Sequence, residues 1–189
     1  RFKSVADTLK EVPVVSAALG PVAGSPASRF VASHFRIMTK DTAQILVAGP
    51  AVVSRAFGKD FTKEELGGSD VHKKNGVTDN IAKNEEDAFY QIKKFLSFFP
   101  SNIYELSKRK ESKDDIDRKE RKLEEIIPKD RKKTYEMREL IEMFVDDRDF
   151  FEISNFFGRG IITGFARLNG YSVGIFANDS NFYAGSMTA

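Results

Sequence analysis

A run of charge in the middle of the chain most constrains how these 189 residues can fold. In residues 107–122 (SKRKESKDDIDRKERK), 13 of the 16 side chains are charged. A segment with so few apolar residues cannot bury a hydrophobic core, so it should form a solvated helix or a flexible linker. A plain connector is the ordinary interpretation, and a docking site for a partner is the alternative. The chain should therefore fold as two units, one on each side of this segment.

The residues before the charged segment alternate between patterns typical of strands and of helices. Residues 12–19 (VPVVSAAL) are continuously apolar, which favours a strand buried on both faces. Ser25 and Pro26 predict a helix that runs to about Ser33, with Ser25 as its N-cap. By similar signals, we expect further strands at 35–39 and 44–48, and further helices at 51–56, 62–66 and 84–100. This alternation argues for an α/β domain.

The residues after the charged segment carry a second set of strand and helix signals. Apolar residues recur at helical spacing over 137–145, which predicts an amphipathic helix. Strands are expected at 150–153, 161–168 and 171–177. Asn169-Gly170 lies between the last two and strongly favours a β-hairpin. This half resembles the opening of another α/β unit.

Composition excludes several classes of function. The 30 basic residues nearly balance the 28 acidic ones, so charge gives no reason to expect binding to nucleic acid or to an anionic membrane. The absence of cysteine excludes disulfides, thiolate metal sites and cysteine nucleophiles. No apolar run reaches the roughly 20 residues of a membrane helix, and no signal-peptide pattern opens the chain. Because the sequence opens on Arg1 and stops just after an apparent strand, we expect it to be a piece of a longer protein.

One turn has the features of a ligand site that uses backbone groups. Residues 20–26 (GPVAGSP) are rich in small side chains, which let a ligand approach the main chain closely. The first amides of the following helix have no internal partner and suit an oxyanion or a phosphate. The spacing matches neither the P-loop nor the dinucleotide-binding fingerprint. From the pattern alone, a tight turn with close packing stays the ordinary alternative.

The polar side chains offer no catalytic or metal-binding set. His34 and His72 each lack a histidine or carboxylate partner three or four residues further on, so a structural or surface role is expected for both. No Gly-x-Ser-x-Gly elbow is present. The acidic pairs at 64–65 and 146–147 are adjacent in sequence and point to different sides of a helix, which favours capping and solvation over acid–base catalysis. We therefore expect no metal site in this segment.

Several phrases, taken in order, resemble the carboxyltransferase β subunit of propionyl-, acetyl- and methylcrotonyl-CoA carboxylases, and the related transcarboxylase and decarboxylase subunits. These phrases are VPVVSAALGPVAGSPA, ILVAGPAVVSRAFGKDFTKEELGGSDVHKKNGVTDN, FLSFFPSN, IIPKDRKKTYEMRELIEMFVDDRDFFE and GFARLNGYSVGIFAN. They cover nearly the whole chain apart from the charged segment. Their order and spacing together are more specific than any single motif.

The resemblance implies an α/β fold of the crotonase-like (ClpP/crotonase) type, a superhelix of β-β-α units. It implies that residues 1–106 are the C-terminal part of the N-terminal carboxyltransferase domain, 107–130 a charged linker, and 131–189 the start of the C-terminal domain. The family's Gly-Gly-Ala-Arg loop should lie before Arg1 and its biotin-facing Gly-Ala loop beyond Ala189. No residue of this chain is therefore matched to biotin.

The function implied by the resemblance is transfer of carboxylate from carboxybiotin to the α-carbon of an acyl-CoA. Biotin would be carried on a partner, so the expected partners are acyl-CoA, the biotin carboxyl carrier and biotin carboxylase components, and further copies of the full-length subunit. The family is cytoplasmic, or in the mitochondrial matrix of eukaryotes. The reverse transfer by an acyl-CoA decarboxylase subunit, or a non-catalytic acyl-CoA-binding or assembly role, stays open.

One functional element of the family falls inside this chain. An Ala-Gly-Gly turn donates backbone amides to the acyl-CoA thioester oxygen, and Ala23, Gly24 and Ser25 align with it. The resemblance thus makes Gly24 and Ser25 the backbone N–H donors of an oxyanion hole, with Ala23 beside the substrate. Ser25 replaces the family's second Gly, so its N–H can serve only if its φ stays negative. Other departures affect the expected acyl pocket and its surroundings: Arg29-Phe30 for Ser-Pro, His34 for Asp, and Asp179-Ser180 for Gln-Pro.

Overall fold

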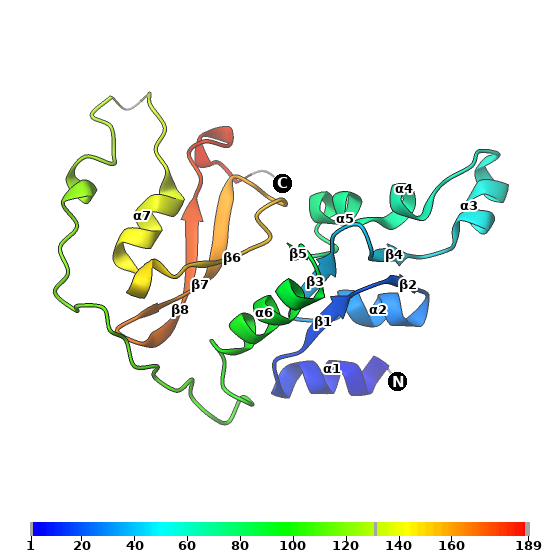
Figure 1. Cartoon of the computed structure of the whole chain (residues 1–189), viewed down its shortest axis with the longest axis horizontal. Helices are drawn as coiled ribbons and strands as arrows, with labels where there is room; N and C mark the ends of the chain where they lie inside the picture. Colours follow the sequence, from blue (N-terminus) through cyan, green and yellow to red (C-terminus); the bar gives the residue numbers. More distant parts are fainter. Residues whose placement is uncertain (1, 131, 188–189) are drawn as a thin grey trace. The chain divides into compact units, whose positions relative to one another are not determined.

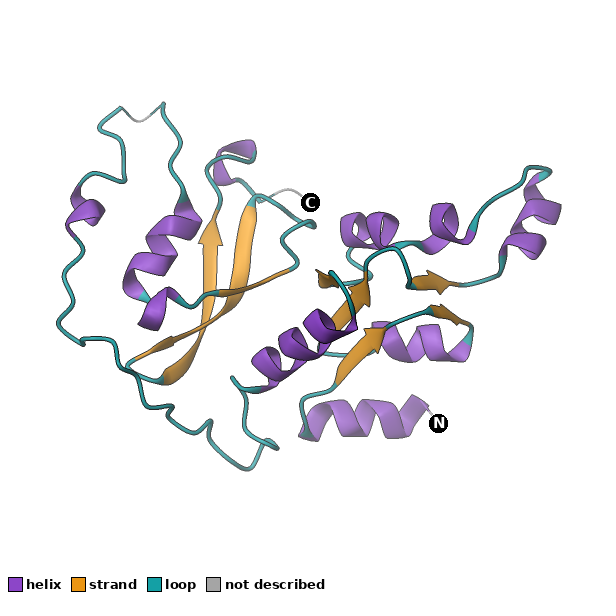
Figure 2. Cartoon of the chain, in the orientation of Figure 1, coloured by secondary structure: helices purple, strands orange, loops and turns teal. Residues whose placement is uncertain are grey.

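The computed structural model describes residues 2–130 and 132–187, which form two compact units. The first unit comprises the chain up to Ser97 together with Ser101–Glu105, and the second comprises Phe98–Pro100 and the residues from Leu106 onward. Figure 1 traces the chain through both units, and Figure 2 shows that each contains helices and strands. The assignment of these units to parts of two carboxyltransferase domains stays a proposal.

The first unit repeats a strand–strand–helix pattern. Its elements are α1 (Phe2–Glu11), β1 (Val15–Ala18), β2 (Pro21–Ala23), α2 (Ser25–Val31), β3 (Phe35–Thr39), β4 (Gln44–Leu46), α3 (Pro50–Phe57), α4 (Lys63–Gly67), α5 (Ser69–Asn75), β5 (Asn80–Ala82) and α6 (Glu85–Leu96). The strands of one repeat pair in parallel with those of the next, β1 with β3 and β3 with β5 in one sheet, and β2 with β4 in another. Successive repeats therefore stack on one another, as the β-β-α expectation requires.

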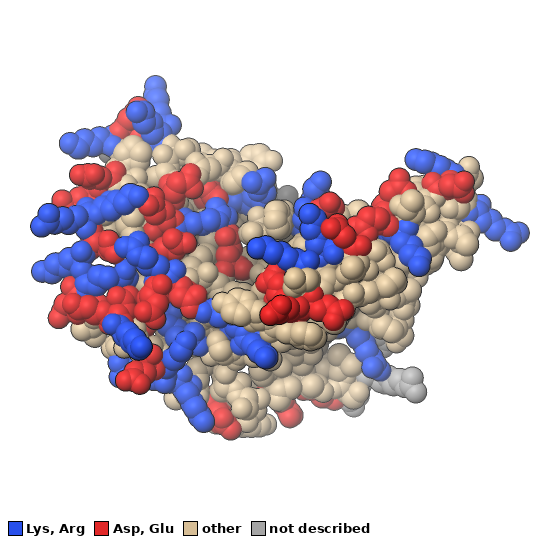
Figure 3. Space-filling model, viewed as in Figure 1, with Lys and Arg blue, Asp and Glu red and all other residues tan. Residues whose placement is uncertain are grey.

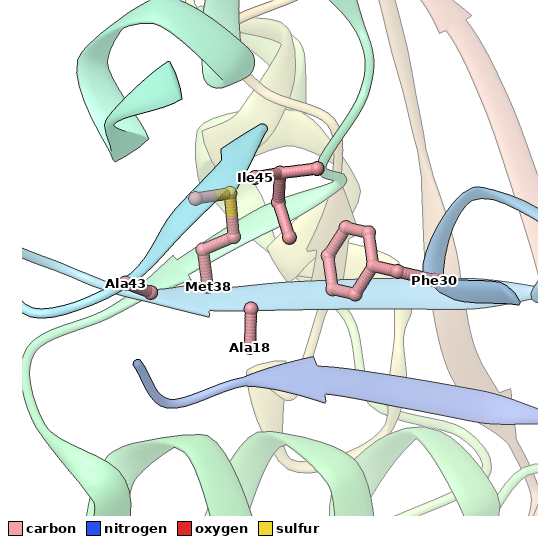
Figure 4. Packing of buried hydrophobic residues seen from close by; sticks show 5 residues of the cluster. All are labelled: Ala18, Phe30, Met38, Ala43 and Ile45. Carbon is pink, nitrogen blue, oxygen red and sulfur yellow. The ribbon is translucent and has the colours of Figure 1, made fainter. Parts of the chain in front are cut away.

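A small apolar core holds these repeats together. Buried residues from β1, α2, β3, β4 and the β3–β4 connection meet in one cluster: Ala18, Phe30, Met38, Ala43 and Ile45. Figure 4 shows Phe30 and Ile45 beside the strand that carries Met38. Because Phe30 is only 3% exposed, the helix that follows Gly24 is fixed to the sheets.

The sequence expectations for the first unit are confirmed for the presence of β1, α2, β3, β4, α3 and α4, whereas α1, β2, α5 and β5 were not predicted. The strand at 12–19 is shorter and is not buried on both faces: Ala18 is buried, but Ala17, whose side chain points to the opposite face, is exposed. Ser25 is the first residue of α2, and Gly24 is the N-cap. The turn at 20–26 contains a strand, β2, that the pattern did not predict.

The second unit is an antiparallel sheet with one covering helix. Its elements are the 3₁₀ turn η1 (Arg121–Glu124), α7 (Met137–Phe144), the 3₁₀ turn η2 (Asp146–Arg148), β6 (Phe151–Ile153), β7 (Ile161–Leu168), β8 (Tyr171–Asn178) and the 3₁₀ turn η3 (Tyr183–Gly185). The expected hairpin is confirmed, since β7 and β8 pair with Leu168 opposite Tyr171. Ile141 and Val145, at the C-terminal end of α7, pack against Ile162 and Ala166 of β7.

Helix α6 ends earlier than expected because the residues after it join a different core. The pattern predicted a helix to Pro100, but α6 ends at Leu96. Phe98 is 2% exposed, and its ring lies 6.2 Å from that of Phe151 and 5.7 Å from that of Phe165. The aromatic residue thus packs in the second unit, and the helix ends before it.

The charged segment is neither a helix nor a detached linker over its described residues. Apart from η1 it has no regular secondary structure, and charged side chains gather over the connection between α6 and α7 (Figure 3). Arg118 donates to the carbonyl of Val145 at 2.8 Å and pairs with Asp114 and Glu120, both at 3.1 Å. The amide of Lys110 donates to the carbonyl of Gly170 at 3.0 Å. Ion pairs and hydrogen bonds therefore attach this segment to the second unit, because it has too few apolar residues to pack there.

Candidate oxyanion site

The three residues matched to the family's oxyanion turn lie together between β2 and α2. Ala23 ends β2, Gly24 is the N-cap of α2, and Ser25 is its first residue. Gly24 has φ 66° and ψ −132°, a combination that side-chain-bearing residues rarely adopt. Glycine is therefore needed at this position for the chain to turn from the strand into the helix.

The helix end of this turn is open to a ligand. Gly24 and Ser25 are both exposed, and Ser25, as the first residue of α2, has no acceptor for its N–H within the helix. A Cβ atom built on Gly24 would meet no heavy atom within 4 Å, so the space beside the turn is open. Ser25 keeps the negative φ of a helical residue, and replacing the family's second Gly by Ser leaves the backbone donor in place.

The turn is held by the elements on either side of it. Ala23 pairs with Leu46 of β4, and the amide of Ser28 donates to the carbonyl of Gly24 at 3.2 Å. Beyond the turn, Phe30 anchors α2 in the core. Two exposed amides are thus presented by backbone that the fold restrains, which is the arrangement that electrostatic stabilisation of an oxyanion requires.

The Gly24 backbone also alters how the site can be tested. A bulky residue such as Val at position 24 would fill the open space beside this turn and block the approach of a ligand. With φ at 66°, any side chain there strains the main chain by about 1–3 kcal/mol. Loss of activity in such a variant would not separate a blocked site from a distorted turn.

The departures from the family pattern occupy different environments. Arg29 and His34 are exposed, and His34 Nδ1 accepts a hydrogen bond from the amide of Val14 at 3.0 Å. Phe30 is in the core, where its ring packs among aliphatic side chains. Asp179 is 1% exposed and forms an ion pair with Arg138. Of these departures, only Arg29 and Phe30 belong to the helix that follows the oxyanion turn.

The remaining sequence candidates have structural roles. Glu65 completes a capping box with Thr62, and hydrogen bonds from Thr62 lower the pKa of its carboxyl group. Asp146 accepts hydrogen bonds from the amides of Asn169 (2.8 Å) and Gly170 (2.6 Å) at the hairpin turn. His72 is buried and lies 2.7 Å from the carbonyl oxygen of Ile45. Capping and turn stabilisation, rather than acid–base catalysis, account for these groups.

An ionic network in the second unit was not foreseen from the sequence. Arg138 of α7 forms hydrogen bonds with both carboxylate oxygens of Glu152 on β6, and also with Asp179 after β8. The pairing with Glu152 raises the pKa of Arg138 above its ordinary value. The only sequence signal was the departure at position 179, because residues 138, 152 and 179 are far apart in the chain.

The described part of the chain contains neither a metal-binding cluster nor a membrane-spanning helix. Within residues 2–130 and 132–187, no three His, Asp or Glu side chains come close enough to hold a metal ion. No helix in that part of the chain is long and apolar enough to cross a membrane.

The known proteins similar to this chain are carboxyl transferases and related subunits. A family model described as the carboxyl transferase domain matches residues 2–189. The methylmalonyl-CoA decarboxylase subunit alpha of Veillonella parvula is 36% identical over 177 residues, which are 93% of this chain and 35% of that protein. The mitochondrial propionyl-CoA carboxylase beta chain of Homo sapiens is 34% identical over 93% of this chain and 33% of its own length.

A solved structure gives the same result for the fold. Transcarboxylase 12S, determined as a hexamer with hydrolysed methylmalonyl-CoA bound, superposes with a TM-score of 0.91 at 34% identity. The match covers 97% of this chain and 36% of that one. The fold is therefore of the crotonase-like carboxyltransferase type, and the chain spans about a third of the length of the relatives that it matches. With its β-β-α repeats and the family match over nearly its whole length, the chain belongs to the carboxyl transferase domain family.

Proposed function

We propose that this chain supplies the acyl-CoA side of a biotin-dependent carboxyltransferase, and that the N–H groups of Gly24 and Ser25 bind the thioester oxygen. The observation that carries the proposal is the β2–α2 turn, where both residues are exposed and the N–H of Ser25, the first residue of α2, has no acceptor within the helix. Family membership supports the reaction class.

The chemistry needs a group that stabilises negative charge on oxygen. Removing a proton from the α-carbon of an acyl-CoA gives an enolate whose charge resides largely on the thioester oxygen. Two fixed N–H donors interact more strongly with that charged oxygen than with the neutral carbonyl, so they lower the barrier rather than merely tightening binding. Carboxybiotin, carried on a partner, would supply the carboxyl group. We assign none of residues 1–189 to biotin.

In this mechanism, none of the protein's side chains acts as a nucleophile or a base. His72 is engaged with the Ile45 carbonyl, and Glu65 with Thr62. The chain thus contributes binding and orientation at one oxygen atom. Its partners in the complete protein would be acyl-CoA, the biotin-bearing components and further copies of the subunit.

The same site could serve carboxyl transfer to or from an acyl-CoA. One relative is named as a decarboxylase subunit and another as a carboxylase chain, at 36% and 34% identity. The same amides would stabilise the same enolate in either direction. We propose carboxylation as the working activity, with decarboxylation of a malonyl-type CoA ester as the alternative.

The proposal is tested by assaying the complete protein with its biotin-bearing partner against a panel of acyl-CoA thioesters. Carboxylated product from at least one short acyl-CoA is the expected result. Biotin-dependent loss of CO₂ from a carboxyacyl-CoA, with no carboxylation, would assign the reverse direction. Thermal stabilisation by acyl-CoA without turnover in either direction would instead indicate a non-catalytic binding subunit and would overturn the proposal.

A further inference from the structure

We infer that His72 is a positioning residue of the oxyanion turn: its imidazole fixes the backbone of β4, and β4 fixes the end of β2 at Gly24. The effect of His72 on the reaction rests on the proposed function. Its effect on the backbone does not, and the two can be measured separately.

The hydrogen bonds around His72 determine which ring nitrogen carries the proton. The side-chain oxygen of Asn75 accepts from the amide of Val77 at 3.1 Å, which directs the Asn75 NH₂ group toward His72 Nδ1, 3.3 Å away. Nδ1 is then an acceptor, so in the neutral ring the proton is on Nε2. Nε2–H therefore donates to the carbonyl of Ile45 at 2.7 Å. With both nitrogens engaged and 8% of the residue exposed, His72 is not free to act as a base.

The helix that carries His72 is held close to β4. A Cβ atom on Gly67, at the end of α4, would lie 2.0 Å from the carbonyl oxygen of Ile45, so only glycine allows this approach. The amide of His72 donates to the carbonyl of Gly68 at 3.1 Å, and Gly68 forms a β-bridge with Gln44. The segment that carries His72 is thus attached to β4 at Gly68, and the imidazole contacts the same strand at Ile45.

Strand β2 depends on β4 for its position. β2 has three residues, of which Pro21 and Ala23 are exposed, and among the described residues β4 is its only partner strand. Val22 pairs with Ile45, the residue that His72 holds, and the next pair joins Ala23 to Leu46. Gly24 follows directly. A shift of Ile45 would therefore be passed to the oxyanion turn through two successive residue pairs, and a donor must be well placed to stabilise an oxyanion.

The test compares two substitutions at one position. In His72→Gln, the side-chain amide can still donate to the Ile45 carbonyl, whereas His72→Leu fills similar space without a donor. Thr163→Val is the matched control, because the Thr163 hydroxyl also donates one hydrogen bond to a backbone carbonyl, that of Ile153 at 3.2 Å, in the second unit. All three variants are made in the complete protein.

Two readouts are measured, amide hydrogen exchange over residues 21–25 and 44–47 and the kinetics of carboxyl transfer. For His72→Leu we expect exchange there to accelerate and kcat to fall about tenfold or more, with the KM for acyl-CoA nearly unchanged, because a misplaced donor weakens mainly the transition state. His72→Gln should restore both, and Thr163→Val should alter neither.

Each result tests a different step of the proposal: the hold of His72 on β4, the effect of β4 on the turn, and the oxyanion site itself. Unchanged exchange in His72→Leu would show that His72 does not hold β4, whatever the activity. Faster exchange with full kcat, in a protein whose activity is lost on Ser25→Pro, would overturn the positioning role. If Ser25→Pro is itself fully active, the proposed oxyanion site is wrong, and the exchange data still show whether His72 positions this backbone.

Discussion

Replacing Ser25 by proline removes one proposed oxyanion donor and puts the proline Cδ atom where the amide hydrogen was. Ser25 is the first residue of α2, its N–H has no acceptor within the helix, and its φ is already negative. Proline is favoured at the first helical position, where its missing N–H leaves no hydrogen bond broken. The residue before it is Gly24, which has no Cβ to clash with the proline ring. The folding cost should therefore be small.

The catalytic cost should be large by comparison. Loss of one oxyanion-hole donor lowers kcat by about 10²–10³, or about 3 kcal/mol in the barrier. Because the Cδ atom also occupies the space in front of the lost N–H, binding of the acyl-CoA should weaken as well, and kcat/KM should fall further than kcat. Ser25→Ala is the control, since it keeps the N–H and removes only a hydroxyl that makes no capping hydrogen bond.

The assay is steady-state carboxyl transfer by the complete protein with its biotin-bearing partner, with the carboxylated acyl-CoA quantified by mass. Unfolding curves of both variants confirm that they fold alike. Ser25→Pro should be about 100-fold slower than Ser25→Ala or worse. A proline variant within roughly threefold of the alanine variant would refute the assignment of this amide.

Three further predictions concern the turn, the charged segment and the helix α4 cap. Gly24→Ala should lower the free energy of unfolding by about 1–3 kcal/mol because of the positive φ, and an unchanged denaturant midpoint would show that the turn tolerates a side chain. Trypsin should cut within residues 107–122 slowly at low ionic strength and faster near 1 M salt, where screening weakens the contacts of Arg118, and cleavage that ignores salt would contradict electrostatic attachment. The backbone amide of Thr62 should titrate by NMR with a midpoint below the ordinary glutamate range of about pH 4, because the pKa of Glu65 is lowered: the cap is intact at neutral pH and is lost as the pH falls through that value. Glu65→Gln should abolish this titration, and its persistence would assign it to another group.

The local signals in the sequence located most of the secondary structure correctly. The capping box at Thr62 and Glu65 and the Asn169-Gly170 turn are each specified by a few adjacent residues, and both are confirmed. Strand β2 was missed because three residues, one of them Pro21, show no alternation that a short-range pattern could detect. It forms only because β4, more than twenty residues later, pairs with it.

Tertiary contacts explain the other differences. The end of α6 depends on Phe98 packing with Phe151 and Phe165, which no helical periodicity can reveal. The charged segment was expected to be a linker because it has so few apolar residues. Arg118 nevertheless pairs with the carboxylate of Asp114 and donates a hydrogen bond to the carbonyl of Val145. Ion pairs between distant residues have no signature in a single sequence.

The oxyanion turn was located by resemblance, and its conformation could not have been deduced from the sequence. Small residues at 20–26 suggested a close approach to backbone, but they did not fix which amides are exposed. The positive φ of Gly24 and the helical φ of Ser25 are properties of the folded turn. Its support by His72 through Ile45 likewise depends on a contact across 27 residues of sequence.

The most direct test is a crystal structure of the complete protein with an acyl-CoA bound. The thioester oxygen should lie about 2.7–3.1 Å from the backbone nitrogens of Gly24 and Ser25, with both N–H groups directed at it. An acyl-CoA whose thioester oxygen contacts other donors, while these two amides face solvent, would contradict the proposed role of the turn.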